Sequence, residues 1–471
     1  KNNHQNTMKR LSILFSFALI TVLSVAQVKY VFMFIGDGMG PNQVLAAEMY
    51  LAELEGKIGR VPLQMTQFPY VGQVATFSLS NAITDSGAAG TCLASGEKTN
   101  NGMIGQSPEG RSIMSIATQL KEQEWGIGIA TSVTIDHATP SSFYAHVPTR
   151  DKEYTIGKQL ALSNFDFFGG GGFSSPYDKT DASAPNLYDV CEDNGYCLVG
   201  GYDEAIKKKD VEKMILLPAE HLVNRSQGAE ALPYAIDRKE GDLNLAEIVN
   251  VAIKQLSQHD RFFLMAEGGK IDYSGHGNDG ATNIHEVIDF DDAVKVAYQF
   301  YEQHPDETLI VVTADHETGG MMLGNSDYTL HLKLLAGQRC SKDSLSSGLA
   351  ALCKEFGKGL TWEQAQRFLS DKTGLYTAVQ VLDEEDQLLR RAFDQMKKNQ
   401  GIERNLYNDI NALAAGAVDI LNRKSRLGWS THGHSGVMVP VFAVGVGAER
   451  FTGWMDNSEI APRIYEATRS N

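Results

Sequence analysis

Basic residues are scarce in this chain of 471 residues. Lysine and arginine number 42 against 58 aspartates and glutamates, which gives a formal net charge of −16. A nucleic-acid-binding protein carries a basic surface, so this balance argues against nucleic acid as a specific partner. An anionic small substrate remains compatible with the composition, because bound metal ions reverse the local field.

Long apolar runs are equally few. Leu11–Val25 is the one stretch that approaches the length of a membrane span, with a basic pair before it and small residues up to Ala26 after it. We interpret residues 1–26 as a secretory signal peptide with some upstream residues. We therefore predict an exported protein, periplasmic or secreted, that keeps no stable membrane span after processing. A retained anchor is the alternative, although the run is short for a span.

Cysteine is the third scarce type, with five in the chain. Export would make disulfides accessible, and closeness in sequence favours Cys191 with Cys197 and Cys340 with Cys353. The sequence leaves these two pairings open. Cys92 would be left over, and we expect it to be a small buried apolar residue.

A phosphate-binding P-loop is also absent. Four consecutive glycines, Gly169–Gly172, occur in the chain, but no Gly-Lys-Ser or Gly-Lys-Thr follows them. We interpret this run as a tight turn near the site.

Apolar runs typical of buried strands alternate with helical patterns along most of the chain. The strand patterns lie at Val28–Ile35, Tyr70–Phe77, Gly126–Thr131, Phe262–Ala266, Leu309–Thr313 and Val439–Gly445. The helical patterns lie at Asn42–Glu55, Ile113–Gln123, Leu245–Leu256 and Ile284–His304. This alternation predicts an α/β fold, a three-layer sandwich whose doubly wound, mainly parallel central sheet has helices on both faces.

Two segments depart from this pattern. Residues 325–427 are charged and poor in strands, with helical patterns at Thr361–Ser370 and Glu384–Lys398. We interpret them as a helical insertion, a lid or a dimer arm, within one catalytic domain of residues 27–471. Asp181–Asp242 is polar and irregular in pattern, and we assign no chemistry to it.

A serine stands before a run of small residues in Ala82–Gly105. Ser86 follows Asp85 and precedes Gly87–Thr91, as in a helix whose first turn presents a hydroxyl. Free backbone N–H groups at a helix N-terminus favour an anion. Ser86 is therefore a candidate nucleophile toward a phosphate-like group, and the alternative is a serine that only caps the helix.

Acidic residues and histidines gather just beyond the predicted strands. They are Asp37, Glu267, Asp272, His276, Asp315, His316 and His434. The carboxyl ends of parallel strands meet at one edge of a sheet, so we expect these side chains to converge. Mixed imidazole and carboxylate ligands suit zinc, and sets of oxygen ligands suit magnesium.

Six motifs that occur in order resemble those of alkaline phosphatases. They are GDGMG, TDSGAAGT, HATPSSFYAH with the following Arg150, EGGKIDYSGH, TADHETGG and HSG. The resemblance implies hydrolysis of phosphate monoesters at alkaline pH. It also implies that Ser86 becomes phosphoserine and that Arg150 clamps the phosphate. We further expect a homodimer.

The resemblance also implies three metal sites. The first zinc site corresponds to Asp272, His276 and His434. The second zinc site corresponds to Asp37, Asp315 and His316. A magnesium site shares Asp37 and adds Thr139 and Glu267.

At three positions near these ligands, the resemblance to the family does not fix the role of the residue. His137 stands where some members of the family have aspartate, which alters the third site, and Tyr273 stands where others have lysine or histidine. We expect His137 and Tyr273 to stand behind the metal ligands. His432 lies two residues before His434, either behind the metal ligands or in solvent.

Other functions remain as alternatives. A phosphodiesterase or a cofactor-independent phosphomutase shares the general pattern, but Arg150, Thr139 and Glu267 favour the monoesterase. A sulfatase is disfavoured because Cys92 lacks the Cys-x-Pro-x-Arg context. A non-catalytic protein that binds metal or phosphate would need no serine nucleophile.

Overall fold

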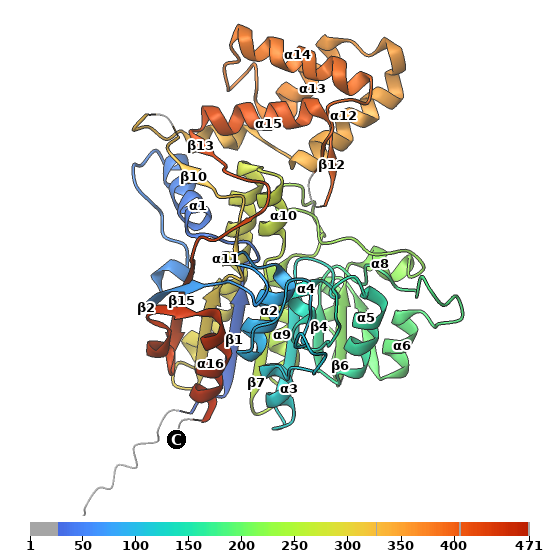
Figure 1. Cartoon of the computed structure of the whole chain (residues 1–471), viewed down its shortest axis with the longest axis vertical. Helices are drawn as coiled ribbons and strands as arrows, with labels where there is room; N and C mark the ends of the chain where they lie inside the picture. The colour runs from blue at the N-terminus through green and yellow to red at the C-terminus, as the bar shows by residue number, and fades with distance from the viewer. Residues whose placement is uncertain (1–26, 326, 405–406, 470–471) are drawn as a thin grey trace, which may run out of the picture.

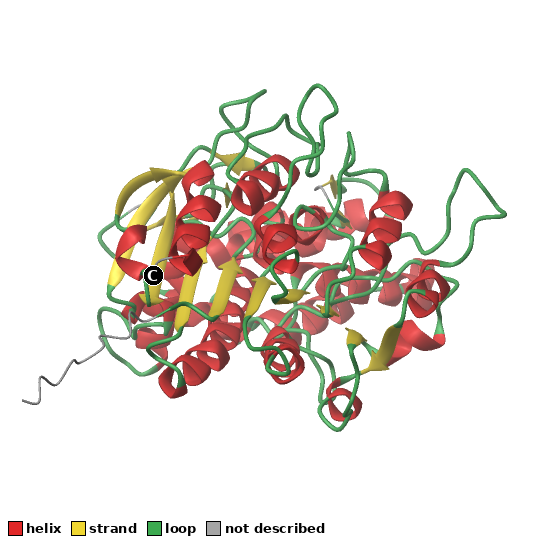
Figure 2. Ribbon diagram, turned by 90° about the horizontal axis from the view of Figure 1, so that it is seen from below, coloured by secondary structure: helices red, strands yellow, loops and turns green. Residues whose placement is uncertain are grey.

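A ten-stranded sheet forms the centre of the computed structural model, which describes residues 27–325, 327–404 and 407–469. The predicted signal peptide, residues 1–26, lies outside the described residues. The strand order is β16-β2-β15-β8-β1-β7-β3-β4-β6-β5 (Figure 2). These strands are β1 Tyr30–Ile35, β2 Tyr70–Ala75, β3 Gly126–Thr131, β4 Phe167–Gly169, β5 Tyr196–Gly200, β6 Lys213–Leu217, β7 Phe262–Glu267, β8 Thr308–Thr313, β15 Val439–Gly445 and β16 Gly453–Asp456. β15 is antiparallel to both of its neighbours, and the other pairs are parallel. The predicted α/β fold is confirmed.

Helices cover both faces of this sheet (Figure 2). The long helices α9 and α11 pack against each other, and α2, α4 and α16 form another group. The helices of the main body are α1 Pro41–Leu54, α2 Ser86–Ser95, α3 Ile116–Lys121, α4 Ala138–Ser141, α5 Glu153–Leu162, α9 Leu245–Leu256, α10 Lys270–His276, α11 Gly280–Gln303 and α16 Ile460–Arg469. β3, β7 and β8 are buried along their whole length, as expected where both faces of a parallel sheet are covered.

The predicted helix over Leu245–Leu256 is confirmed as α9, with the same bounds. α11 begins four residues before its predicted start, because the Asp279 side chain caps it by accepting from the Thr282 N–H. α3 begins later than its pattern suggests, because the Ser115 hydroxyl accepts from the Thr118 N–H at that point. Capping side chains, rather than apolar periodicity, fix these two starts.

The segment Asp181–Asp242 is not irregular, so that expectation is wrong. It contributes β5 and β6 to the edge of the sheet, with the short helices α6 Leu187–Asp193, α7 Tyr202–Ala205 and α8 Ala219–Val223 beside them. Both strands are only five residues long, and β6 begins with a lysine, so each leaves a short apolar run in the sequence. The glycine run that precedes this segment ends β4 and turns the chain, with φ +106° at Gly172.

The helical segment 325–427 lies beyond the sheet as a layer of its own (Figure 1). It contains α12 Lys342–Phe356, α13 Trp362–Thr373, α14 Asp383–Lys397 and α15 Ala412–Lys424, together with the two-residue strands β11 Glu403–Arg404 and β12 Asp409–Ile410. The helical patterns of this segment are confirmed. Its role as a lid or dimer arm stays a prediction.

All five cysteines are free, so neither pairing that the sequence favours is formed. Cys191 is fully buried in α6 and Cys197 is half-buried in β5, so the two thiols lie in different environments. Cys92 is buried as expected, and burial raises the pKa of its thiol to about 12. Among the described residues, no helix combines the length and apolarity that a membrane crossing needs.

Glycine is required at the turn after β1. Gly38 has φ +72°, and a Cβ there would lie 2.8 Å from Thr318 Oγ1 and 2.9 Å from Asp272 Cα. Gly56 has a similar φ of +70°, but a Cβ there would meet nothing within 4 Å. The two glycines therefore separate the cost of the conformation from the cost of close packing.

We expect Gly38→Ala to lower the stability more than Gly56→Ala does. The left-handed conformation alone costs about 1–2 kcal/mol, and only at Gly38 must neighbouring backbone also move. Denaturant unfolding of both variants beside the unsubstituted protein measures the difference. Equal losses of unfolding free energy in the two variants would show that Asp272 and Thr318 move away from the added Cβ without cost.

Candidate active site

Three adjacent strands deliver carboxylates to one edge of the sheet. β1 lies between β7 and β8, with Ile35 in register with Glu267 on one side and Thr313 on the other. Asp37 follows β1 directly, and Asp315 follows β8. The expected convergence of these strand ends is therefore observed.

Two further elements bring in the remaining ligands. α10 carries Asp272 and His276 one turn apart, and they face each other at 3.4 Å. The short strand β14, His434–Ser435, pairs antiparallel with β9, Glu317–Thr318, which places His434 opposite Thr318. As a result the rings of His434 and His316 stack with centroids 3.6 Å apart.

The first cluster consists of Asp272, His276 and His434. His276 Nε2 lies 3.2 Å from His434 Nε2, and both face Asp272 Oδ1. The Nδ1 of His276 donates to the carbonyl of His432, and the Nδ1 of His434 donates to the carbonyl of Thr84. Because carbonyls only accept, both Nε2 atoms are left with lone pairs that point at each other. A cation between them satisfies this arrangement.

The second cluster consists of Asp37, Asp315 and His316, all fully buried. His316 Nε2 lies 3.5 Å from Asp37 Oδ1 and 3.3 Å from Asp315 Oδ2. The same nitrogen lies 3.3 Å from Ser86 Oγ. The candidate nucleophile therefore stands directly at the edge of this cluster.

The third cluster brings together the three predicted residues and one more, His137. It brings together Asp37, Glu267 and His137, and Thr139 Oγ1 donates to Asp37 at 3.4 Å. The sequence placed His137 behind the ligands, but its ring is close enough to offer a nitrogen atom. Burial lowers the pKa of His137 to about 3, assisted by the positive charge of Arg150, so this imidazole is neutral.

The buried carboxylates require positive charge. Burial raises the pKa of Glu267 to about 7 and that of Asp315 to about 8, and burial together with Asp315 and Asp272 raises the pKa of Asp37 well above its usual range. Burial also opposes ionisation of Asp272, but His276, His434 and His316 hold its pKa below the usual range. Among the described residues, Asp37 Oδ1, Glu267 Oε1 and Asp315 Oδ2 have no hydrogen-bond partner. These residues therefore fit bound metal ions.

Ser86 is the first residue of α2, and Asp85 is its cap, accepting from the Ala88 N–H at 3.0 Å. The alternative of a serine that caps the helix is therefore wrong. Ser86 is 1% exposed, with its hydroxyl directed at His316. Because Asp85 caps the helix, the Ser86 hydroxyl is not needed for capping.

Arg150 lies beside the same helix start. Its Nη1 is 3.6 Å from Asp85 Oδ2, and its Nη2 is 3.1 Å from His137 Nε2. These two partners orient the guanidinium toward the serine and the third cluster. Its side chain is 26% exposed, so it lines the entrance rather than the floor of the site.

The remaining sequence candidates lie around the first cluster. His432 Nδ1 donates to the His276 carbonyl at 2.9 Å, but the residue is exposed, so it both contacts the backbone of a ligand and faces solvent. Tyr273 lines the entrance, with its ring centroid 5.8 Å from that of His137. Sequence reasoning missed Tyr407, which stacks on Tyr273 with centroids 3.5 Å apart. It belongs to no motif, so only the fold reveals it.

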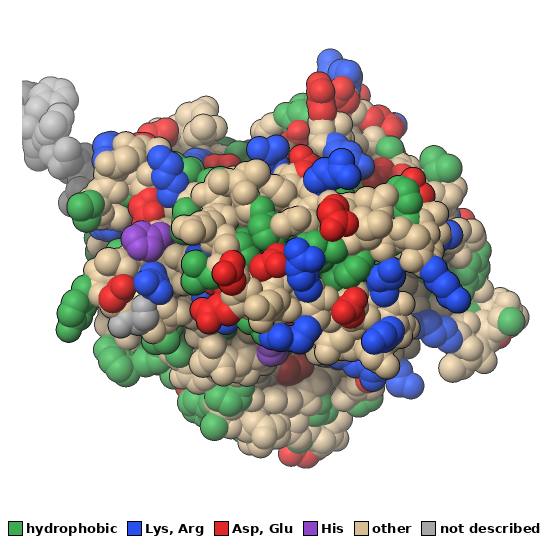
Figure 3. Space-filling view, turned by 90° about the horizontal axis from the view of Figure 1, so that it is seen from above, with side chains coloured by type: hydrophobic (Ala, Val, Ile, Leu, Met, Phe, Trp, Pro, Cys, Tyr) green, Lys and Arg blue, Asp and Glu red, His purple; other side chains and the backbone are tan. Residues whose placement is uncertain are grey.

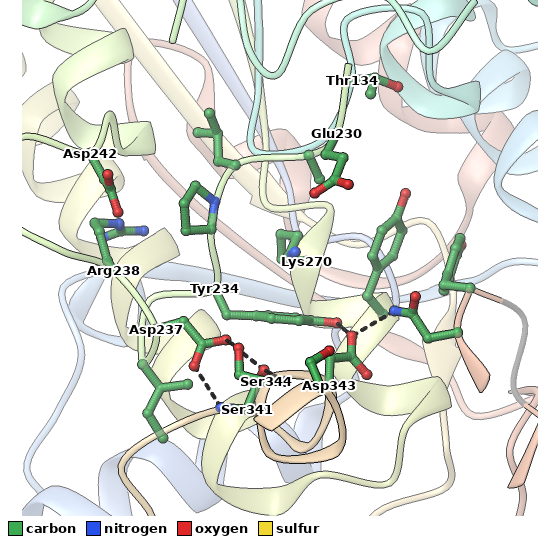
Figure 4. A pocket seen from close by; sticks show the side chains of 18 of the residues that line it. Thr134, Glu230, Tyr234, Asp237, Arg238, Asp242, Lys270, Ser341, Asp343 and Ser344 are labelled. Atoms are coloured by element: carbon green, nitrogen blue, oxygen red, sulfur yellow. Dashed lines mark hydrogen bonds between the residues drawn. The ribbon is translucent and has the colours of Figure 1, made fainter. Parts of the chain in front are cut away.

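A cavity of about 1460 Å³ opens beside Arg150 and Tyr273. The main body and the helical segment 325–427 both line it. Figure 4 shows Asp343 and Ser344 of α12 facing Tyr234 and Lys270 across this space. On the side of the molecule where the helical segment lies, lysines and arginines are interspersed with acidic residues and form no broad basic field (Figure 3).

The site combines a serine at a helix start, an arginine and three clusters of acids and imidazoles. Together these are the features of a metal-dependent hydrolase of phosphate esters. A sequence model of the alkaline phosphatase family matches residues 28–469. The chain belongs to the alkaline phosphatase family and is a phosphoric monoester hydrolase.

Similar proteins cover nearly the whole chain. Alkaline phosphatase 3 of Bacillus subtilis is 30% identical over 455 residues, which cover 94% of this chain and 90% of the relative. The repressible alkaline phosphatase of Saccharomyces cerevisiae is 28% identical and covers 88% of this chain and 75% of its own length. The crystal structure of a cold-active alkaline phosphatase from a psychrophilic Shewanella species has a TM-score of 0.78 at 28% identity, with 93% and 99% of the two chains covered.

Removal of metal should destabilise the protein more at pH 8 than at pH 5.5. Glu267 and Asp315 have folded pKa values near 7 and 8, above their ordinary values. In metal-free protein the folded state keeps these groups protonated above their ordinary pKa values, so stability falls as the pH rises from about 4 to the folded pKa values near 7 and 8, and the loss is complete only at pH 8. Melting temperatures of chelator-treated and zinc-loaded protein, compared at each pH, measure the effect. An equal gap at both pH values would contradict it.

Proposed function

We propose that this enzyme cleaves phosphate monoesters through a phosphoserine formed on Ser86, with two zinc ions, one magnesium ion and an alkaline pH optimum. The observation that carries the proposal is the place of Ser86 Oγ, 3.3 Å from His316 Nε2 at the edge of the second cluster. A hydroxyl is a weak nucleophile unless a neighbouring group favours its ionised form. Ser86 is buried where such groups converge.

The metal assignment follows from the donor atoms. The first and second clusters combine imidazole with carboxylate, which suits zinc. When bound, the ions would supply a pair of Lewis acids that stabilise the attacking and leaving oxygens. Asp272, His276 and His434 would hold one ion, and Asp37, Asp315 and His316 the other.

The third site is assigned to magnesium because Asp37, Thr139 and Glu267 offer oxygen atoms. A mutant alkaline phosphatase from the Antarctic bacterium TAB5 is described with magnesium bound in its M3 site. It is 25% identical with a TM-score of 0.65, and 94% of this chain and 99% of that chain are covered. His137 adds a nitrogen donor here and brings this site closer to the chemistry that zinc prefers.

The proposal has three further parts, of which the first rests on the sequence and the other two on the structure. Residues 1–26 direct export to the periplasm or the medium. The chain forms a homodimer, for which exposed apolar side chains on and after the β2–β16 edge, Val71, Phe77, Leu79 and Trp454, provide a surface. The segment 325–427 acts as a lid, because Tyr407 reaches the first cluster from it.

Ser86→Ala should lower phosphomonoester turnover by at least about 10³-fold, because no other group replaces the nucleophile. Metal content should stay unchanged, since the serine is outside all three clusters. Ser95→Ala at the other end of α2 is the matched control, because its hydroxyl bonds to nearby backbone: it donates to the Thr91 carbonyl and accepts from the Glu97 N–H. Failure to trap phosphoserine at acidic pH in unsubstituted protein would refute the intermediate.

Arg150→Ala should slow monoester hydrolysis about 10–150-fold and diester hydrolysis much less. A monoester dianion presents three free oxygens, two of which a guanidinium holds together, a contact of about 1.5–3 kcal/mol. Arg150→Lys should restore only part of the rate, because an ammonium lacks the fork geometry. Steady-state kinetics on matched mono- and diesters measure the ratio.

Arg339→Ala serves as the control for charge in the cavity, because Arg339 lines it but is exposed. This variant should leave the ratio unchanged. If Arg150→Ala slows both substrate classes equally, the arginine does not discriminate between them.

A further inference from the structure

We propose that Tyr407 is a positioning residue that fixes the Asp272 carboxylate and thereby sets the zinc affinity of the first cluster. The inference rests on the proposed zinc site at Asp272, His276 and His434. It assigns to segment 325–427 a direct part in metal binding, through a residue far from the ligands in sequence.

The hydroxyl of Tyr407 donates to Asp272 Oδ2 at 2.9 Å. The other oxygen of the same carboxylate, Oδ1, faces the two imidazoles and accepts from Thr318 Oγ1 at 2.5 Å. Asp272 is fully buried, so its rotation is set by these protein partners and not by water. Tyr407 and Thr318 therefore hold the carboxylate from its two ends.

The ring of Tyr407 fixes where its hydroxyl points. It lies flat on Tyr273, the residue after Asp272, with 3.5 Å between centroids and 21° between planes. It also meets the edge of His276, with centroids 5.6 Å apart. The ring thus contacts α10 at two residues that follow Asp272.

The segment that carries Tyr407 is itself anchored. Asn408 Nδ2 donates to Asp343 Oδ2 at 2.7 Å, and the same oxygen accepts from the hydroxyl of Tyr234 (Figure 4). Lys342 pairs with Glu403, and its Nζ donates to the Gly277 carbonyl at 2.9 Å, directly after α10. These contacts tie the insertion to both the cavity wall and the helix that bears the ligands.

Partners that hold a metal-bound carboxylate raise the affinity of the site, and their removal typically weakens metal binding about 10–100-fold. If Tyr407 contributed only packing, the contacts of its ring would be sufficient, and loss of its hydroxyl would leave the zinc affinity unchanged. The Tyr407→Phe variant separates these roles, because the stack on Tyr273 and the edge contact with His276 stay in place.

The test compares zinc affinity in the full-length holoenzyme by competition with a chelator. We expect Tyr407→Phe to weaken one of the two zinc ions about 10–100-fold while the other keeps its affinity. Tyr376→Phe is the matched control, because its hydroxyl also donates to a carboxylate, Asp386 Oδ1 at 2.8 Å, within the same insertion. Its zinc affinities should equal those of the unsubstituted protein.

Zinc affinity of Tyr407→Phe within twofold of the unsubstituted protein would overturn the inference. A His276→Ala variant distinguishes the source of such a failure. If His276→Ala loses one zinc ion while Tyr407→Phe loses no affinity, only the role of Tyr407 is refuted. If His276→Ala keeps both zinc ions, the proposed zinc site and this inference fail together.

Discussion

The burial of four carboxylates in one place is the constraint on which the rest of the site depends. Asp37, Glu267, Asp272 and Asp315 are all fully buried at the ends of the central strands. Burial raises the pKa of Glu267 to about 7 and that of Asp315 to about 8, and only for Asp272 do the histidines hold the pKa below its usual range. Such a group is stable in its ionised form only beside cations. These buried carboxylates therefore need bound metal ions in order to be ionised, which accounts for the metal dependence of the family.

The sheet holds these buried carboxylates in fixed positions. β7, β1 and β8 are adjacent and parallel, so their ends hold Glu267, Asp37 and Asp315 at one level. Helices cover both faces of these strands, and the strands cannot separate to relieve the repulsion. The backbone carbonyls of His432 and Thr84 then fix the tautomers of His276 and His434. Each imidazole directs a lone pair inward because its other nitrogen is already occupied.

Much of the fold and site could be predicted from the sequence, because strand ends are local features. Asp37 and Asp315 follow apolar runs whose meaning needs no knowledge of the rest of the chain. The pairing of β9 with β14 is different, since it depends on residues that are distant in sequence. β5 and β6 were missed because each is only five residues long and its apolar run is shorter still, which gives little signal. His137 was placed behind the ligands because spacing alone does not say which way a ring turns.

The insertion shows most clearly what sequence patterns leave out. Its helices have ordinary amphipathic patterns, and nothing in those patterns connects them with the strand ends. Yet Lys342 of α12 contacts the Gly277 carbonyl, and its own N–H donates to Asp279, the residue that caps α11. The insertion therefore touches the chain where α10 ends and α11 begins. Because α10 carries Asp272 and His276, these contacts join the helical segment directly to the helix that positions two members of the first cluster.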